Sequence, residues 1–417
     1  MEQKKRIDHL DVAKGLAMLA IMVGHMGFSS PHNVAYNLVF QFHVPLFFIL
    51  AGYTLSTRRP VGEFARNKAR RLLVPYAIVC AILVALTICF RIALGHTNPP
   101  TQFFGVRSCI EACITGAGSF SLPLPEGQTI VGAIWFLEAL FWALLEVRIC
   151  LATPRLAPLV VCGLFAVGIK LTTRVFVPLN ILQGMIAALY VYIGYLMRRF
   201  SLLEKGLPWP VVLALAIFAG VTAWRGVYVS LVRAYLGPHC IGFVTSVTTS
   251  LLVVQAAKAI SDWGGTPKRL LVWVGQNSLV FLGVHLILLD CGLRWMLEQT
   301  GLPAGTNVIP FVDLSIQLLA CVVAVRMATV LDARKSKPEA RQAQDRRGLR
   351  ELGLELGEVL GAEPLDKVVE RLQLLLLGGL LHLLEVGHRG CVYHLLARVD
   401  GHAAPYGERN RVGWATV

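Results

Sequence analysis

The sequence predicts an all-α protein, a polytopic transmembrane helical bundle of about ten spans with both termini in the cytoplasm. The first observation behind this prediction is composition, because 55% of the 417 residues are hydrophobic and only 15% are charged. Soluble proteins carry about 25% charged residues. The mean hydropathy of +0.62 is the second observation, and the placement of the basic residues is the third. So much apolar surface requires surrounding lipid.

Ten segments are long and apolar enough to cross a bilayer, which takes about 20 residues of helix. Their hydrophobic periodicity is weak, as expected of helices that are apolar on nearly every side. The first segment lacks the short apolar region and small-residue cleavage site of a signal peptide, so we expect it to remain in the mature protein. The segments are 10–28, 36–57, 72–95, 130–148, 156–174, 178–197, 209–224, 239–260, 271–292 and 308–331.

The basic residues predict the orientation of these spans. The chain has 39 Lys and Arg against 25 Asp and Glu, a net charge of +14 that would elsewhere suggest a nucleic-acid binder. If the N-terminus is cytoplasmic, 17 of the cations in the membrane region lie on the inner side and 7 on the outer side. Cytoplasmic loops are enriched in Lys and Arg. The charge is therefore an orientation signal, and nucleic acid is excluded as a partner.

Two domains are predicted, a membrane domain over 1–332 and a charged cytoplasmic tail over 333–417. The tail holds 13 basic and 11 acidic residues, and we expect it to be partly helical over 339–371 and otherwise loosely ordered. Its apolar run 372–384 is too short to span a bilayer.

The cysteines predict no metal site. None of the ten cysteines forms a CxxC pair, and no zinc-ligand spacing occurs. Cys109 and Cys113 lie in the outer loop, and the sequence leaves open whether they pair in an oxidising compartment.

The first span carries three ionisable residues, which inside a membrane are functional candidates by default. Lys14 and His25 are 11 positions apart, which is three helical turns plus about 20°, so both project from one face about 16 Å apart along the axis. An alternative reading is that Lys14 extends to the inner headgroups beside Asp11 while His25 is interfacial.

The second span carries His43 two residues before Pro45. Proline removes a backbone hydrogen bond from a helix, and a polar residue beside such a break often lines a cavity. A satisfied packing role for His43 is equally compatible with the sequence.

Five motifs in order resemble acyltransferase family 3, the integral-membrane O-acyltransferases that modify cell-surface carbohydrates and related acceptors. The resemblance covers about 6–331 and is closest to the fucose O-acetylase-like subgroup. Each motif alone is weak, and their order makes the resemblance specific. The motifs are Asp11-x-x-Lys14-Gly15 with Gly24-His25, Phe42-His43-x-Pro45-Leu-Phe47-Phe48 with Gly52-Tyr53, Lys68-x-x-Arg71 with Pro75, Ile134-Trp135-Phe136-Leu137, and Gly275-Gln-Asn277-Ser278 with His285.

The family's characteristic pair is Arg, ten residues, then His, and this chain has Lys14 at the Arg position, ten residues before His25. Lysine is a point charge without the planar fork of arginine, so contact with the donor differs in detail. The resemblance implies an acyl-CoA co-substrate, generally acetyl-CoA, with no bound cofactor. It implies an acceptor hydroxyl on a cell-surface carbohydrate or a lipid-linked sugar, and a place in the cell membrane of a bacterium.

Three residues are predicted to be catalytic, and the resemblance strengthens the case for Lys14 and His25. His25 would be the general base on the acceptor hydroxyl, a role that needs a pKa near the working pH. Lys14, with the basic segment Lys68, Arg70 and Arg71, would attract the donor's phosphates or hold the pore open. His43 ranks just below His25. For donor or substrate binding the candidates are Asp11, Lys68, Arg71, Trp135, Glu138, Asn277, Ser278 and His285.

Structural readings stand beside these assignments. The basic segment with Lys68 and Arg71 is also an ordinary positive-inside signal, and polar groups within spans often form interhelical hydrogen bonds. Asp313 could equally form an ion pair with an interfacial cation such as Arg294. A multi-span transporter or flippase of a glycan precursor is the competing function, although no internal repeat supports it. The acyl group, the acceptor and the oligomeric state stay open.

Overall fold

The computed structural model describes residues 7–25, 33–94, 103, 105–203, 206–290, 292–293, 297 and 308–335. Within these residues the chain is helical with connecting loops and has no strand, apart from one isolated bridge between Ser230 and Tyr235. The prediction of an all-α fold is confirmed for this part of the chain. The tail segments 339–371 and 372–384 lie outside the described residues, as does Arg294.

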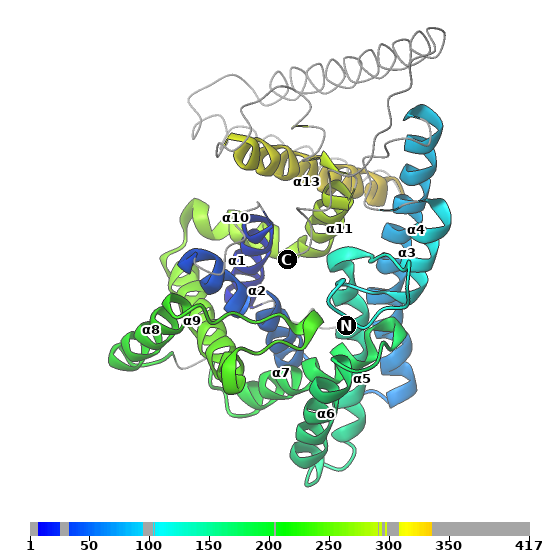
Figure 1. Ribbon diagram of the computed structural model, residues 1–417. Coiled ribbons are helices and arrows are strands. Elements are labelled where there is room, and N and C mark those ends of the chain that lie inside the picture. Colours follow the sequence, from blue (N-terminus) through cyan, green and yellow to red (C-terminus); the bar gives the residue numbers. More distant parts are fainter. Residues whose placement is uncertain are drawn as a thin grey trace, which may run out of the picture. The chain divides into compact units, whose positions relative to one another are not determined.

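Figure 1 shows the helices. Their bounds match the predicted spans to within a few residues except at α3, α5 and α10, and α4 corresponds to no predicted span. The α-helices are α1 (Asp8–Gly24), α2 (Val34–Tyr53), α3 (Val61–Leu94), α4 (Val106–Thr115), α5 (Trp135–Cys150), α6 (Ala157–Thr172), α7 (Ile181–Arg199), α8 (Trp209–Trp224), α9 (Ile241–Trp263), α10 (Gly265–Gln276), α11 (Ser278–Asp290) and α13 (Val308–Lys335). Four 3₁₀ turns are η1 (Gly132–Ile134), η2 (Pro178–Asn180), η3 (Leu231–Arg233) and η4 (Pro238–Cys240).

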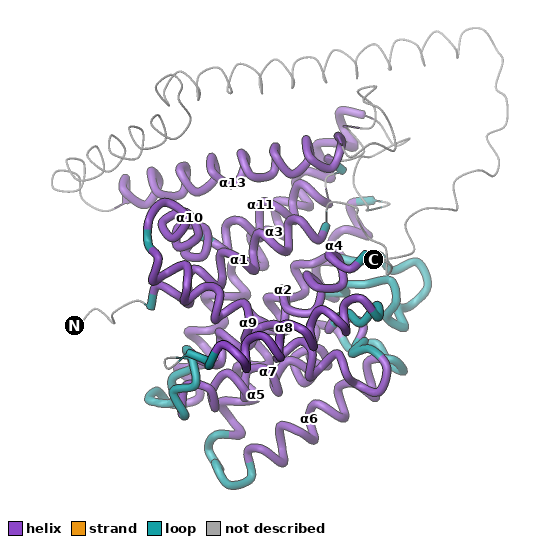
Figure 2. Tube along the Cα trace, turned by 90° about the vertical axis from the view of Figure 1, so that its left-hand side faces the viewer, coloured by secondary structure: helices purple, strands orange, loops and turns teal. Residues whose placement is uncertain are grey.

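Five of the described helical segments are long and apolar enough to cross a membrane, and a sixth is added if the bent pair α10 and α11 forms one span. Two further apolar helices, α6 and α8, have only 16 residues each. Figure 2 shows that helices of all lengths, drawn in purple, make up most of the described chain. The five segments are Val34–Tyr53, Val61–Ala93, Pro178–Arg199, Pro238–Trp263 and Ile309–Val330.

The predicted span over 271–292 is bent in the structure. The chain bends by 71° between α10 and α11. Asn277 lies at the bend, where both its backbone N–H and its side-chain amide donate to the Trp273 carbonyl near the end of α10, at 3.2 and 2.8 Å. Ser278 then begins α11. The motif Gly275-Gln-Asn277-Ser278 is therefore the site of a helix break.

Contacts divide the chain into two units, and the residues considered below belong to the first, which includes Met1–Ile88 and Pro99–Cys321. The described part of the second unit is the last residues of α3 and the later part of α13. Within the first unit α1 contacts α2, α9, α10 and α11, and α2 contacts α7, α8 and α9. α7 also packs against α5 and α6.

Glycines let the central helices approach one another closely. A Cβ on Gly275 would overlap the Asp11 carbonyl oxygen, and one on Gly15 would overlap the Leu271 carbonyl, so α1 and α10 touch backbone to backbone. Gly52 and Gly194 do the same between α2 and α7. Small residues at crossings are typical of helix packing in membranes, where apolar side chains gain little by leaving lipid.

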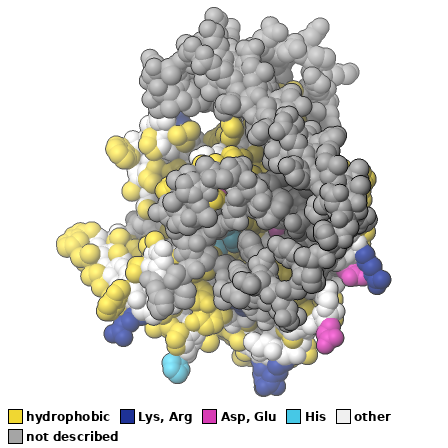
Figure 3. All heavy atoms as spheres, turned by 45° about the horizontal axis from the view of Figure 1, so that its top comes forward, with side chains coloured by type: hydrophobic (Ala, Val, Ile, Leu, Met, Phe, Trp, Pro, Cys, Tyr) yellow, Lys and Arg dark blue, Asp and Glu magenta, His cyan; other side chains and the backbone are white. Residues whose placement is uncertain are grey.

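The outer faces of the shorter helices are apolar. Leu159 on α6 is 73% exposed, and Ile217 on α8 is 58% exposed. On the face drawn in Figure 3, hydrophobic side chains cover much of the described surface. Exposed apolar patches of this kind mark contact with another apolar phase, and lipid supplies it for a chain with this many apolar helices.

Candidate active site

Three histidines from different helices gather at the end of α1. His25 follows the last turn of α1, and its ring centroid lies 5.4 Å from that of His285 on α11. Phe40 joins the third histidine to them, because its ring lies 6.3 Å from His25 and 4.5 Å from His43 on α2. His43 and His285 are both buried. The fold thus brings together two predicted catalytic histidines and one predicted binding residue.

Two of these rings have a defined tautomer. His43 Nδ1 lies 2.9 Å from the Val39 carbonyl oxygen and so donates to it. His285 Nδ1 contacts the side-chain oxygen of Gln317, whose amide nitrogen donates to Asp313 at 2.7 Å. In a neutral imidazole, a hydrogen on Nδ1 leaves Nε2 with a lone pair. Both rings therefore offer Nε2 as a proton or hydrogen-bond acceptor.

The sequence alone does not identify Gln317 as a candidate site residue. It indicates Asp313 as a possible partner of interfacial cations. The available signal was their spacing of four residues on an otherwise apolar segment, which places both side chains on one face of α13. Gln317 is 32 residues from His285 in the sequence, so no short sequence motif predicts their contact.

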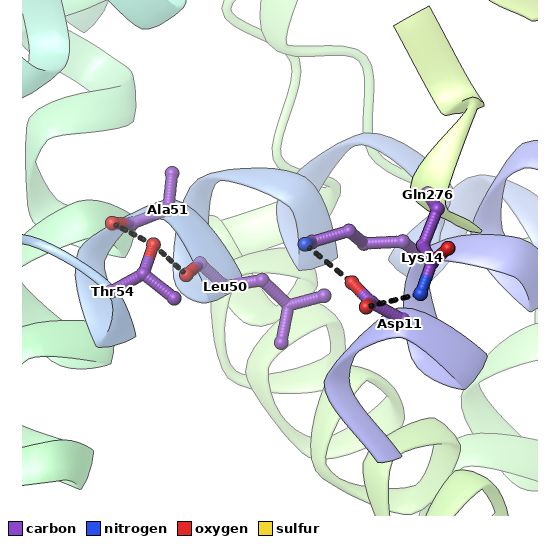
Figure 4. A network of polar contacts seen from close by, with 6 residues as sticks. All are labelled: Asp11, Lys14, Leu50, Ala51, Thr54 and Gln276. Atoms are coloured by element: carbon purple, nitrogen blue, oxygen red, sulfur yellow. Dashed lines mark hydrogen bonds and ion pairs between the residues drawn. The ribbon is translucent and has the colours of Figure 1, made fainter. Parts of the chain in front are cut away.

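Lys14 lies toward the opposite end of α1 in an ion pair with Asp11. Lys14 Nζ is 3.0 Å from one Asp11 oxygen, and the Gln276 amide approaches the other at 3.5 Å. The Lys14 side chain is 31% exposed and that of Asp11 is 12% exposed. Figure 4 shows this network together with the last turn of α2, where Thr54 donates to the carbonyls of Leu50 and Ala51. An accessible ammonium is thus held at one end of α1.

The basic segment lies on α3. Lys68 Nζ is 5.5 Å from the centroid of the Phe64 ring on the same helix, and Arg71 is exposed. α3 begins at Val61, eleven residues before the predicted span, so these cations extend the helix beyond its apolar part.

Glu138 belongs to a network that ties helices together. Asn180 donates to Glu138 at 2.8 Å and to the Gly116 carbonyl at 2.7 Å. Gly116 has a φ of 71°, and a Cβ there would overlap the Glu138 carboxylate. Trp135, which is buried, packs against Gly118 in the same loop. These contacts match the structural reading of Glu138 as an interhelical hydrogen-bonding residue.

Aromatic rings continue from the histidines to a loop after α8. Tyr36 stacks on Phe40 with centroids 4.1 Å apart and lies 6.2 Å from Tyr228. Tyr228 in turn lies 4.7 Å from Tyr235, which is 38% exposed. The loop is attached to α2, because Gln41 donates to the Val227 carbonyl at 3.0 Å. A row of rings thus leads from His25 to an accessible tyrosine.

Cys109 and Cys113 are free thiols in the structure. Thr87 contacts the Cys109 sulfur at 3.8 Å. Hydrogen bonds to Cys109 and Cys80, together with burial, raise the pKa of the Cys113 thiol. Among the described residues, no group of three or more His, Cys, Asp or Glu side chains is arranged to hold a metal ion.

A family model described as an acyltransferase domain, that of acyltransferase family 3, matches residues 7–329. The chain belongs to this family. The match covers all three histidines and the Lys14 ion pair, and ends before the tail. Searches of curated proteins and of solved structures found no match. Family membership and the apolar helices together make the protein a membrane acyltransferase.

Proposed function

We propose that this membrane acyltransferase moves a short acyl group, acetyl, from acyl-CoA to a hydroxyl of a cell-surface carbohydrate or lipid-linked sugar. The observation that carries the proposal is the gathering of His25, His43 and His285 at one end of α1, with the Lys14 ammonium toward the other end. A base and an anion-binding group on one helix suit a reaction whose two substrates arrive from opposite sides.

In the proposed reaction the acceptor oxygen attacks the thioester carbonyl carbon, the carbon–sulfur bond breaks, and CoA leaves as a thiol. His25 removes the hydroxyl proton as the new carbon–oxygen bond forms and returns it to the departing sulfur. General-base assistance of this kind contributes about 10²- to 10⁴-fold to a rate. The products are an O-acyl ester and free CoA.

The donor side of the proposal rests on the cations. Lys14 is partly exposed although paired with Asp11, so it remains able to attract the phosphates of the donor. Lys68 and Arg71 on α3 add positive charge on the side assigned to the cytoplasm. The Asp11-x-x-Lys14-Gly15 variant motif supports placement in the fucose O-acetylase-like subgroup.

The acceptor side rests on the aromatic row. Tyrosine has an apolar ring face and a hydroxyl that donates and accepts hydrogen bonds. Such a side chain suits a sugar, which has an apolar face and polar edges. Tyr235 is the most accessible ring of the row, so we place the carbohydrate acceptor between it and His25.

The ten-span arrangement with both termini in the cytoplasm belongs to the same proposal. Its support is that each predicted segment coincides with a described helix or, at 271–292, with the bent pair α10 and α11. The excess of cations on the proposed inner side supports the orientation.

The direct test uses the purified protein in lipid nanodiscs with acetyl-CoA and a panel of carbohydrate acceptors. Release of CoA thiol that depends on an acceptor is the expected result, whereas a transporter would consume no acetyl-CoA. His25→Asn, which removes the base with little change in size, should lower kcat about 10²- to 10⁴-fold. His239→Asn is the matched control, because His239 is exposed in η4 and has a φ of 48° that asparagine tolerates. A folded and fully active His25→Asn protein would overturn the assignment of the base.

A further inference from the structure

The ring of His285 is held by a chain of hydrogen bonds whose residues have no role in the reaction described above. The chain runs from Asp313 to Gln317 to His285 Nδ1. All three side chains are at most 3% exposed. The other nitrogen, His285 Nε2, is buried and makes no hydrogen bond within the described part of the chain. A buried ring nitrogen without a partner is uncommon, because burying an unsatisfied polar atom costs about 1–3 kcal/mol.

The order of donors and acceptors follows from the chemistry of the three groups. The nitrogen of the Gln317 amide faces Asp313 and donates to its carboxylate oxygen at 2.7 Å. The amide oxygen is then left for His285, and this oxygen also only accepts. His285 Nδ1 must therefore carry a hydrogen, and in the neutral ring the lone pair is on Nε2. The Asp313 carboxylate thus determines the tautomer of His285 through the Gln317 amide that lies between them.

We infer that Asp313 and Gln317 are positioning residues that hold His285 in the Nδ1–H tautomer, so that its Nε2 accepts a hydrogen bond from His25 when the acceptor hydroxyl binds. The inference rests on the proposed function, since it explains how His25 becomes an oriented base. The His25 and His285 rings are 5.4 Å apart between centroids. Catalytic hydrogen bonds are often long in a protein without substrate and tighten on binding.

Each proton has a defined place in this arrangement. One ring nitrogen of His25 donates its hydrogen to His285 Nε2, and the other takes the proton of the acceptor hydroxyl. The resulting imidazolium of His25 keeps its bond to His285 until the proton passes to the CoA sulfur. No proton is left over, and His285 keeps its own on Nδ1.

A purely structural role would be a connection between α11 and α13, since buried polar groups in membranes often form interhelical hydrogen bonds. The variant Asp313→Asn separates the two roles because it preserves size while changing the chemistry. The new amide both donates and accepts, so either orientation of the Gln317 amide is satisfied and the tautomer of His285 is no longer specified. Packing between the helices is unchanged.

We expect Asp313→Asn to lower kcat roughly 10- to 100-fold, the usual effect of losing a group that orients a functional histidine, with both KM values unchanged. Adding Gln317→Glu to this variant should restore most of kcat. The new carboxylate accepts from His285 Nδ1 on one side and from the new amide on the other. Ser246→Ala is the matched control, because it removes another buried interhelical hydrogen bond, 2.8 Å to Tyr190, and should leave kcat unchanged.

The tautomer itself is read by ¹⁵N NMR of histidine-labelled protein in lipid, with the signals of His285 identified by their loss in His285→Asn. The wild-type protein and the double variant should show the Nδ1–H form, and Asp313→Asn a mixture. An Nε2–H form in the wild-type protein, or an unchanged kcat in Asp313→Asn, would overturn the inference. If the wild-type protein releases no CoA with any acceptor, the proposed function fails, while the NMR result still decides the tautomer.

Discussion

The role of Lys14 is indicated by the side chains that surround it. The sequence left two readings open, an anion site or a side chain that extends to the headgroups beside Asp11. The structure forms the pair with Asp11 and adds Gln276 from α10 on the other carboxylate oxygen. The carboxylate orients the ammonium, while the 31% exposure of Lys14 leaves it accessible to a second anion.

Replacing Lys14 tests this reading. Lys14→Met keeps the length of the side chain and removes its charge, so we expect KM for acetyl-CoA to rise about 10- to 100-fold, the equivalent of about 1.5–3 kcal/mol for a hydrogen bond to a charged group. Lys14→Arg restores a cation and should stay within a fewfold of the wild-type KM. Steady-state kinetics with varied acetyl-CoA measure both. An unchanged donor KM in Lys14→Met would instead favour the headgroup reading.

At the scale of the element, the contact between α1 and α10 decides where the Lys14 network lies. A Cβ on Gly275 would overlap the Asp11 carbonyl oxygen, so the two helices must separate in Gly275→Ala. Overpacking of this kind costs about 1–3 kcal/mol. We expect a lower thermal denaturation midpoint because the two helices are forced apart. We also expect a higher KM for acetyl-CoA, because Gln276 moves away from Asp11.

Gly220→Ala serves as the control for the glycine substitution. Gly220 lies within α8, and a Cβ there meets no atom within 4 Å. Alanine is the better helix former, so this variant should match or exceed the wild-type midpoint. Equal loss of stability in both variants would contradict the assignment of a close crossing to Gly275.

The loop after α8 is the second element with a testable role. Tyr235→Ala removes the exposed end of the aromatic row, and we expect KM for the carbohydrate acceptor to rise about tenfold while KM for acetyl-CoA stays constant. Phe120→Ala is the matched control, because Phe120 is an aromatic residue of another predicted outer loop and is 55% exposed. If both variants change the acceptor KM equally, the row has no specific role in binding.

At the scale of the whole molecule, the distribution of cations predicts which loops face each side of the membrane. Two exposed loop positions on opposite predicted sides are Glu126, before α5, and Arg155, after it. In a background without the native cysteines, Glu126→Cys should react with a membrane-impermeant maleimide on intact cells. Arg155→Cys should react only after permeabilisation, and the reverse pattern would invert the proposed orientation.

The apolar segments and the helical fold followed from the sequence, because a segment's hydropathy depends only on its own residues. The approximate bounds of most helices followed for the same reason. The break between α10 and α11 did not follow from the sequence. It lies at Asn277, just after Gly275 packs against Asp11, and Asp11 is far away along the chain. The early start of α3 was missed because Lys68 and Arg71 lie on a helical but charged turn, which a search for apolar runs omits.

The sequence by itself determined that this chain is an all-helical membrane protein of acyltransferase family 3, and it singled out Lys14, His25 and His43. Only the tertiary structure showed that His285 joins the other histidines and that Gln317 connects its ring to Asp313. The physical reason is that spacing along one helix fixes which residues share a face, whereas a hydrogen bond between helices depends on how their backbones pack. Here the close approach of α1 to α10 at glycine, and the contacts of α11 with α1, bring those side chains together.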